Sequence, residues 1–77
     1  MQQREIDLVL EACQEADWLV SQDPGTADLE VLERARLKMN DLLMARRWDE
    51  AIQMAYAITL RHAGRADEAD IIERMEN

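Results

Sequence analysis

The sequence contains one cysteine and one histidine, Cys13 and His62, whose side chains are of types that can act as nucleophile or base. Cys13 lies on an apolar stripe between Glu11 and Glu15, whereas a reactive thiol needs a basic, partly exposed setting. His62 falls near the end of an expected helix, where an imidazole interacts favourably with free backbone carbonyls. We therefore expect structural roles for both residues and no catalytic site.

The closest approach to a metal-binding group is Asp67, Asp70 and Glu73, which share one expected helix. Carboxylate metal sites in helical bundles add a Glu-x-x-His pattern, and calcium loops space oxygen ligands around a glycine. Neither pattern is present, and Gly25 and Gly64 both stand at expected turns, so no Gly-rich phosphate loop exists either. The sequence predicts a solvated acidic helix, no metal, no cofactor and no enzyme.

The charge of the chain limits its partners, because 17 acidic residues face 9 basic ones and give a net charge of −8. Affinity for nucleic acid comes largely from Lys and Arg that neutralise phosphates, so direct nucleic-acid binding is disfavoured. The acidity has two interpretations: it keeps the protein soluble, or it complements a basic partner or mimics a phosphate backbone. We prefer solubility, since charged faces of short helices are usually just solvated.

The length and the termini point to a small protein that needs help to be stable. A chain of 77 residues forms one domain (1–77) and buries only about 60% of its unfolded surface, which makes self-association or a partner expected. The start of the chain lacks a signal-peptide pattern, and no apolar run approaches the roughly 20 residues of a membrane span. We expect a soluble, cytoplasmic protein that does not bind membranes.

Two amphipathic helices are expected in the first half, at about 3–22 and 27–46, separated by Asp23-Pro24-Gly25. In the first helix, apolar residues at spacings of three and four lie on one face. These predicted core residues are Ile6, Val9, Cys13, Ala16 and Val20. In the second helix, which Thr26 is expected to cap, the same pattern predicts Leu29, Leu32, Ala35, Met39 and Leu42. These two helices should form an antiparallel hairpin.

The second half predicts helices at about 49–63 and 66–75, the first capped by Asp49 and ended by Gly64. The helix at 49–63 is apolar nearly all round, so we expect it at the centre of the structure or across an oligomer interface. The fourth helix, with Ala69, Ile72 and Met75 inward, is short enough to fray unless it packs. The expected fold is therefore an all-α bundle of four short helices in two consecutive hairpins.

One short phrase occurs twice: residues 47–51 read Arg-Trp-Asp-Glu-Ala, and residues 65–69 read Arg-Ala-Asp-Glu-Ala. With its flanking residues, 45–52 resembles the turn between the two helices of a tetratricopeptide repeat, and 64–69 resembles another such turn. The two turns are 18 residues apart, whereas that family repeats every 34 residues, and Arg46 stands where a small residue is expected. The resemblance, over about the last 35 residues, implies a helical hairpin that binds protein. Size and helicity also resemble the small helical chaperones of bacterial secretion systems, which pair with a partner chain.

Aromatic, apolar and acidic side chains supply the candidates for a partner surface. Trp18 falls off the main stripe of its helix, so it packs back on the Pro24 turn, packs against the fourth helix or anchors a partner. Trp48 is expected to staple a turn. The residues predicted to contact a partner are Trp18, Met54, Tyr56, Ile58, Glu11, Glu15, Asp67 and Asp70.

We expect a non-catalytic, acidic interaction module that serves as adaptor, chaperone or inhibitor of one protein partner, which can have a basic surface. A homodimer through the helix at 49–63 is compatible with this function. The alternative is a nucleic-acid mimic that blocks a DNA- or RNA-binding protein and is encoded by a mobile element. A continuous stripe formed by the acids of the first and fourth helices would favour the mimic, and scattered acids would favour the module.

Overall fold

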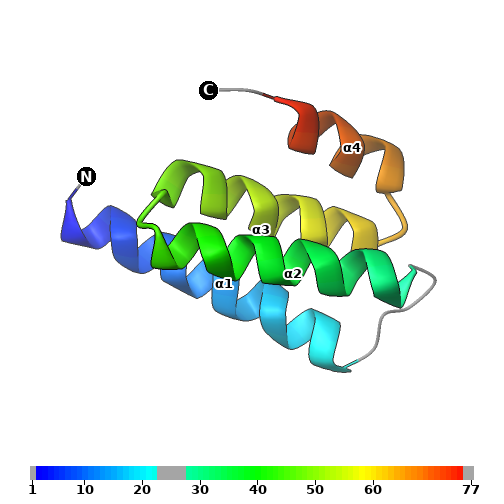
Figure 1. Ribbon diagram of the computed structural model, residues 1–77, viewed down its shortest axis with the longest axis horizontal. Helices are drawn as coiled ribbons and strands as arrows, with labels where there is room; N and C mark the ends of the chain where they lie inside the picture. The colour runs from blue at the N-terminus through cyan, green and yellow to red at the C-terminus, as the bar shows by residue number, and fades with distance from the viewer. Residues whose placement is uncertain (1, 23–27, 76–77) are drawn as a thin grey trace.

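The computed structural model describes residues 2–22 and 28–75, which form four helices: α1 (Gln3–Gln22), α2 (Leu29–Met44), α3 (Trp48–His62) and α4 (Ala66–Arg74). Successive helices run in alternating directions (Figure 1). The prediction of a small all-α bundle is confirmed. The expected break at Asp23-Pro24-Gly25 and the expected cap Thr26 lie outside the described residues.

Helix α3 is the centre of the structure, because it packs against each of the other three helices. Helices α1 and α2 meet less extensively with each other than either does with α3, and α4 contacts α3 alone (Figure 1). The apolar stripes of α1 and α2 therefore converge on α3 rather than chiefly on each other. The predicted central position of the most apolar helix is confirmed.

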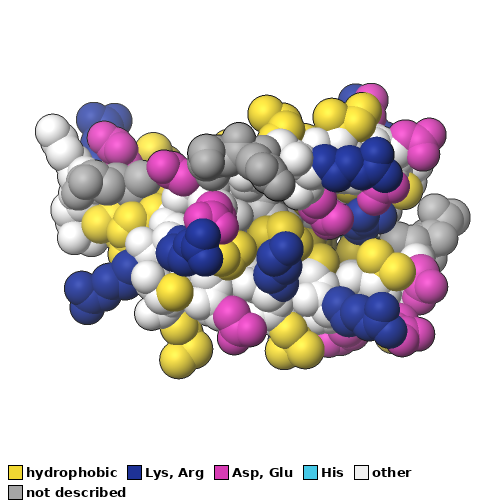
Figure 2. Space-filling model, turned by 45° about the horizontal axis from the view of Figure 1, so that its top comes forward, with side chains coloured by type: hydrophobic (Ala, Val, Ile, Leu, Met, Phe, Trp, Pro, Cys, Tyr) yellow, Lys and Arg dark blue, Asp and Glu magenta, His cyan; other side chains and the backbone are white. Residues whose placement is uncertain are grey.

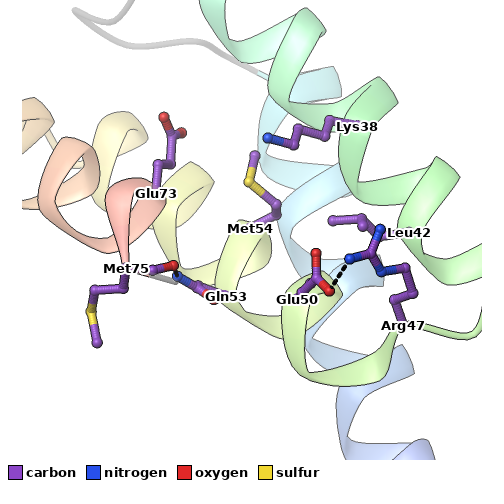
Figure 3. Close-up of a pocket in the computed structure, with 8 residues that line it drawn as sticks. All are labelled: Lys38, Leu42, Arg47, Glu50, Gln53, Met54, Glu73 and Met75. Atoms are coloured by element: carbon purple, nitrogen blue, oxygen red, sulfur yellow. Dashed lines mark hydrogen bonds and ion pairs between the residues drawn. The ribbon is translucent and has the colours of Figure 1, made fainter. Parts of the chain in front are cut away.

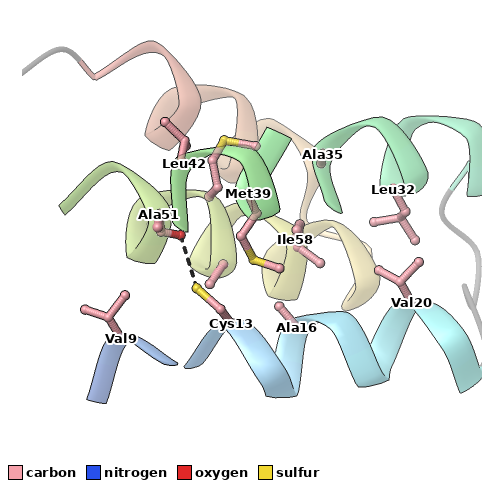
Figure 4. Packing of buried hydrophobic residues seen from close by; sticks show 12 residues of the cluster. Val9, Cys13, Ala16, Val20, Leu32, Ala35, Met39, Leu42, Ala51 and Ile58 are labelled. Atoms are coloured by element: carbon pink, nitrogen blue, oxygen red, sulfur yellow. Dashed lines mark hydrogen bonds between the residues drawn. The ribbon is translucent and has the colours of Figure 1, made fainter. Parts of the chain in front are cut away.

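The core is built from the side chains that the helical spacing predicts. Val9, Cys13, Ala16 and Val20 of α1 face Ala51 and Ile58 of α3, with residues of α2 completing the cluster (Figure 4). The Cys13 thiol donates a hydrogen bond to the carbonyl oxygen of Ala51, with Sγ and O 3.7 Å apart. The largest side chains that are fully buried are Leu32, Met39 and Ile58.

Two of the predicted core residues lie at helix ends and are exposed instead. Leu29 is 48% exposed because α2 starts there: the Asp28 side chain caps the helix by accepting a hydrogen bond from the Glu30 amide at 2.9 Å. Met75 is 61% exposed because it follows the last residue of α4 with an extended backbone, so it leaves the helical face. Leu29 is the first residue of α2 and Met75 lies just beyond the last residue of α4, so both stand at the limits of the helical period that predicted them.

The repeated phrase gives the same local structure both times. Before each copy, a residue with positive φ ends the preceding helix: Arg46 with φ 58° and Gly64 with φ 81°. The amides of Arg46 and Arg47 bond to the carbonyls of Leu43 and Leu42, and those of Gly64 and Arg65 bond in the same way to Arg61 and Leu60. This pair of bonds is the Schellman motif of helix C-termini.

Each copy then starts the next helix in the same way. Arg47 and Arg65 occupy the cap positions, and each pairs with the glutamate three residues on at 2.5 Å. Asp49 was expected to cap the third helix but lies inside its first turn, because the helix begins one residue earlier, at Trp48. The alanine that closes each phrase is fully buried against a neighbouring helix.

Replacing Arg46 with glycine should stabilise the protein. A residue with a β-carbon is destabilised by about 1–2 kcal/mol in the left-handed region, and glycine removes this cost. Part of the stabilisation is lost because glycine is more flexible in the unfolded chain. We expect the free energy of unfolding to rise by about 0.5–1 kcal/mol, measured by urea denaturation. The matched control is Gly64→Arg in the equivalent turn, which should lower stability. An R46G protein no more stable than the parent would contradict the assignment of strain to Arg46.

Candidate protein-binding surfaces

The face of α1 that points away from the core carries an exposed stripe, which we name the α1 outer face: Leu8, Glu11, Glu15 and Trp18. Spacings of three, four and three residues place these side chains along one side of the helix, opposite the buried stripe. Leu8 is 56% exposed and Trp18 is 58% exposed, and their positions are about 15 Å apart at the rise of an α-helix. The exposure of Trp18 agrees with its position off the main stripe of the helix.

The carboxylates between these two apolar side chains are free of ion pairs within the described part of the chain. Elsewhere arginines hold many of the acidic groups: Arg36 reaches Asp17 at 3.2 Å and Glu33 at 2.7 Å, and Arg34 reaches Glu30 at 2.5 Å. The hydrogen bonds that Arg36 donates to Glu33 and Asp17 raise the pKa of Arg36. The carboxylates of Glu11 and Glu15 are thus available to pair with a cationic group of a partner.

Helix α3 exposes less apolar surface to a partner than the sequence indicates. Met54 is 6% exposed and Ile58 is fully buried, and both belong to the core between α3 and its neighbours, so little of either side chain is accessible to the predicted partner. Tyr56 is 56% exposed, in agreement with its predicted place on a surface. A homodimer through α3 would therefore have to use Tyr56 without Met54 or Ile58.

The acidic residues of α4 divide between an exposed residue and an ion-pair cluster. Asp67 is exposed in the first turn. Asp70 binds Arg61 of α3, and Glu73 binds the same guanidinium with both oxygens, at 3.2 Å from Nε and 3.0 Å from Nη2. The hydrogen bond to Glu73 raises the pKa of Arg61 although partial burial opposes it. Asp70 therefore anchors α4 to α3 instead of standing free for a partner.

The acids of α1 and α4 do not join into one stripe. Both helices pack on α3, but they do not contact each other and lie on different sides of it (Figure 1). Two of the α4 acids are also neutralised by Arg61. The described residues therefore do not form the continuous acidic stripe that the mimic would require.

A groove runs between α2 and α4 because these helices flank α3 without touching each other. We name it the α2–α4 groove; one hollow in it has a volume of about 340 Å³. The groove is lined chiefly by Val31, Arg34, Lys38 and Leu42 from α2, Met54 at the floor and Glu73 from α4. Lys38 and Glu73 stand on its two walls with Met54 between them (Figure 3).

The groove differs in charge from the rest of the chain. Three basic residues, Arg34, Lys38 and Arg47, and two acidic ones, Glu50 and Glu73, line it, which leaves one surplus positive charge in a chain of −8. Each of these groups except Lys38 has an ion-pair partner in the described residues. Figure 2 shows the surface that results, where hydrophobic side chains emerge among Lys, Arg, Asp and Glu.

The two side chains of types that can act as nucleophile or base lie in α1 and α3. Burial raises the pKa of the Cys13 thiol to about 11, so almost no thiolate exists at neutral pH. His62 is the last residue of α3. Across residues 2–22 and 28–75, no three or more His, Cys, Asp or Glu side chains gather in a way that could hold a metal ion. In the same residues no helix combines the length and the apolar character needed to span a membrane.

Sequence reasoning missed Leu8 and Lys38. Leu8 lies at helical spacing from Trp18, so continuing the off-stripe face of Trp18 backward would have found it. Lys38 becomes a groove residue only because α4 leaves α2 uncovered, and no local pattern around residue 38 reports that.

Comparison of the chain with protein-family models, with curated proteins and with solved structures found no match. The resemblances to tetratricopeptide hairpins and to secretion-system chaperones remain predictions.

Proposed function

We propose that this protein is a non-catalytic interaction module that binds one protein partner through the α1 outer face and acts as its adaptor, chaperone or inhibitor. The observation that carries the proposal is the joint exposure of Leu8 and Trp18 on the helix face that also holds the unpaired Glu11 and Glu15. Large apolar side chains exposed together, rimmed by charge, are typical of interaction sites, and tryptophan is enriched at binding hot spots.

The chemistry of this face defines the partner. Trp18 and Leu8 fit an apolar groove or helix surface, and two carboxylates one turn apart on the same face match Lys or Arg at its rim. Binding would cover the partner's apolar surface, which stabilises it or blocks its other contacts. A reducing, cytoplasmic location belongs to this proposal.

The nucleic-acid mimic is the weaker proposal. Its inhibition would rest on many separated carboxylates, so raising the salt concentration should weaken its binding steeply. An apolar contact centred on Trp18 should instead keep most of its affinity in salt. Measuring partner affinity at low and high salt therefore separates the two proposals.

Trp18→Ala should abolish retention of the partner. Truncating an interface tryptophan typically costs 2 kcal/mol or more, roughly a thirtyfold loss of affinity. The measurement is affinity capture on the immobilised protein from an extract of the organism that carries the gene, with mass spectrometry, followed by titration of the retained protein. A second variant, Glu11→Gln with Glu15→Gln, should mainly slow association and reduce its salt dependence.

The matched control is Leu37→Ala, because Leu37 is 57% exposed on α2, almost the same fraction as Leu8 on α1. The L37A protein should retain the partner like the parent, and L8A should lose it in part. If W18A and L37A capture the same proteins in the same amounts, the α1 outer face is not the binding surface and the proposal fails.

A further inference from the structure

We propose that the α2–α4 groove is a second binding site, which receives an acidic amphipathic helix of a partner protein. This inference goes beyond the function proposed for α1, because it concerns another surface and a partner segment of opposite charge. It rests on the shape of the groove, on its apolar floor and on the unpaired charge of Lys38.

The shape follows from the way in which α4 is attached. In a closed four-helix bundle each helix packs on two neighbours, but α4 contacts only α3 and leaves the adjoining side of α2 uncovered. In Figure 1 α3 lies between α2 and α4, and side chains of all three helices line the groove. A partner helix lying in the groove would contact α2, α3 and α4 at once, in the helix-in-groove mode of recognition.

The floor and the α2 wall supply apolar contacts. Val31 is 36% exposed on the α2 wall. Leu42 and Met54 reach the groove from the core, with 8% and 6% of their surface exposed (Figure 3). Met54 is a flexible, polarisable side chain that adapts to the shape of an apolar ligand. A leucine-rich face at spacings of three and four residues fits this lining.

The charge expected of the partner helix follows from which charged side chains of the groove already have an ion-pair partner. Glu73 on the α4 wall is held at both carboxylate oxygens by Arg61, and Glu50 is paired with Arg47 at 2.5 Å. Lys38 on the opposite wall has no ion-pair partner in the described chain, and Arg34 stands one turn before it. A carboxylate on the incoming helix would pair with Lys38 and meet the excess positive charge of the groove.

The groove and the α1 outer face can be occupied together. Helix α4, which forms one wall of the groove, does not contact α1. A protein that holds a basic partner on α1 and an acidic segment in the groove would be an adaptor between the two.

The experiment uses the intact protein and three synthetic 14-residue helical peptides with one leucine-rich face, which differ only in carrying Glu, Gln or Lys at the other positions. Binding is followed by fluorescence anisotropy. Non-specific attraction to a chain of net charge −8 would favour the Lys peptide. We expect the opposite order: the Glu peptide should bind most tightly, and Lys38→Glu should weaken it about tenfold or more.

Two control variants locate the site. Arg4→Glu makes a similar charge reversal at an exposed position of α1 outside the groove and should leave Glu-peptide binding unchanged. Trp18→Ala should leave it unchanged as well, so failure of this inference is distinguishable from failure of the proposed function. Circular dichroism confirms that K38E keeps its helices.

Three results would overturn the inference. The Lys peptide could bind best, K38E and R4E could weaken the Glu peptide equally, or W18A could abolish its binding, which would move the site to α1. Sedimentation of the free protein tests whether a second copy of the chain occupies the groove instead. Self-association that K38E abolishes and R4E does not would assign the groove to that second copy.

Discussion

Replacing Ile58 with alanine should lower the free energy of unfolding by about 2–5 kcal/mol. Ile58 is fully buried in the central helix, within the core cluster shared by α1, α2 and α3. Its removal leaves a cavity that three packed helices cannot close without moving. A domain of 77 residues is stable by about 4–12 kcal/mol at ordinary values per residue, so I58A should be partly unfolded at physiological temperature. Urea denaturation followed by circular dichroism measures this loss.

The matched control is Tyr56→Ala, two residues earlier on the same helix. Tyr56 is 56% exposed, so the Y56A protein should stay within about 0.5 kcal/mol of the parent. The pair also tests whether Ile58 lies in the core or at a dimer interface. An interface residue would change the sedimentation of the protein and leave the stability of a monomer unchanged, and that outcome would contradict the core position described above.

The pair Ile58 and Tyr56 also shows where sequence reasoning stops. In α1 the polar residues between Val9, Cys13, Ala16 and Val20 mark the outside of the helix, so spacing alone identified the buried face. In α3 apolar residues occupy almost every direction, and the hydrophobic period no longer separates core from surface. The sequence therefore identified α3 as central, but it could not tell that Tyr56 faces outward while Met54 and Ile58 face inward.

The two candidate surfaces were predictable to different degrees. The α1 outer face depends on one helix, and Glu11, Glu15 and Trp18 were placed on it correctly from their distance to the buried stripe. The α2–α4 groove depends on a contact that does not form, between helices separated by the whole of α3. Local sequence patterns predict which face of a helix is buried, but they do not predict which pairs of helices fail to pack against each other. Lys38 could therefore be recognised only from the assembled fold.

Replacing Arg61 with methionine should release α4 from the bundle. The Arg61 side chain is 13% exposed and joins α3 to Asp70 and Glu73, which are 44% and 28% exposed. Hydrogen bonds to charged groups contribute about 1.5–3 kcal/mol, and an isolated helix as short as α4 is marginal in water. Hydrogen exchange read by mass spectrometry should show that α4 loses most of its protection while α1, α2 and α3 keep theirs.

The control for this variant is Arg65→Met, which removes the pair with Glu68 at the start of the same helix. Both partners are more than half exposed, at 59% and 51%, so its loss should cost about 0–1 kcal/mol and leave α4 protected. The contacts that remain in R61M include the buried Ala69 and the Gln53 amide, which donates to the backbone carbonyls of Ile72 and Met75. Full protection of α4 in R61M would mean that these contacts suffice to hold it. Because α4 is one wall of the groove, undocking it should also remove binding of the Glu peptide, whereas capture of a partner through Trp18 should persist.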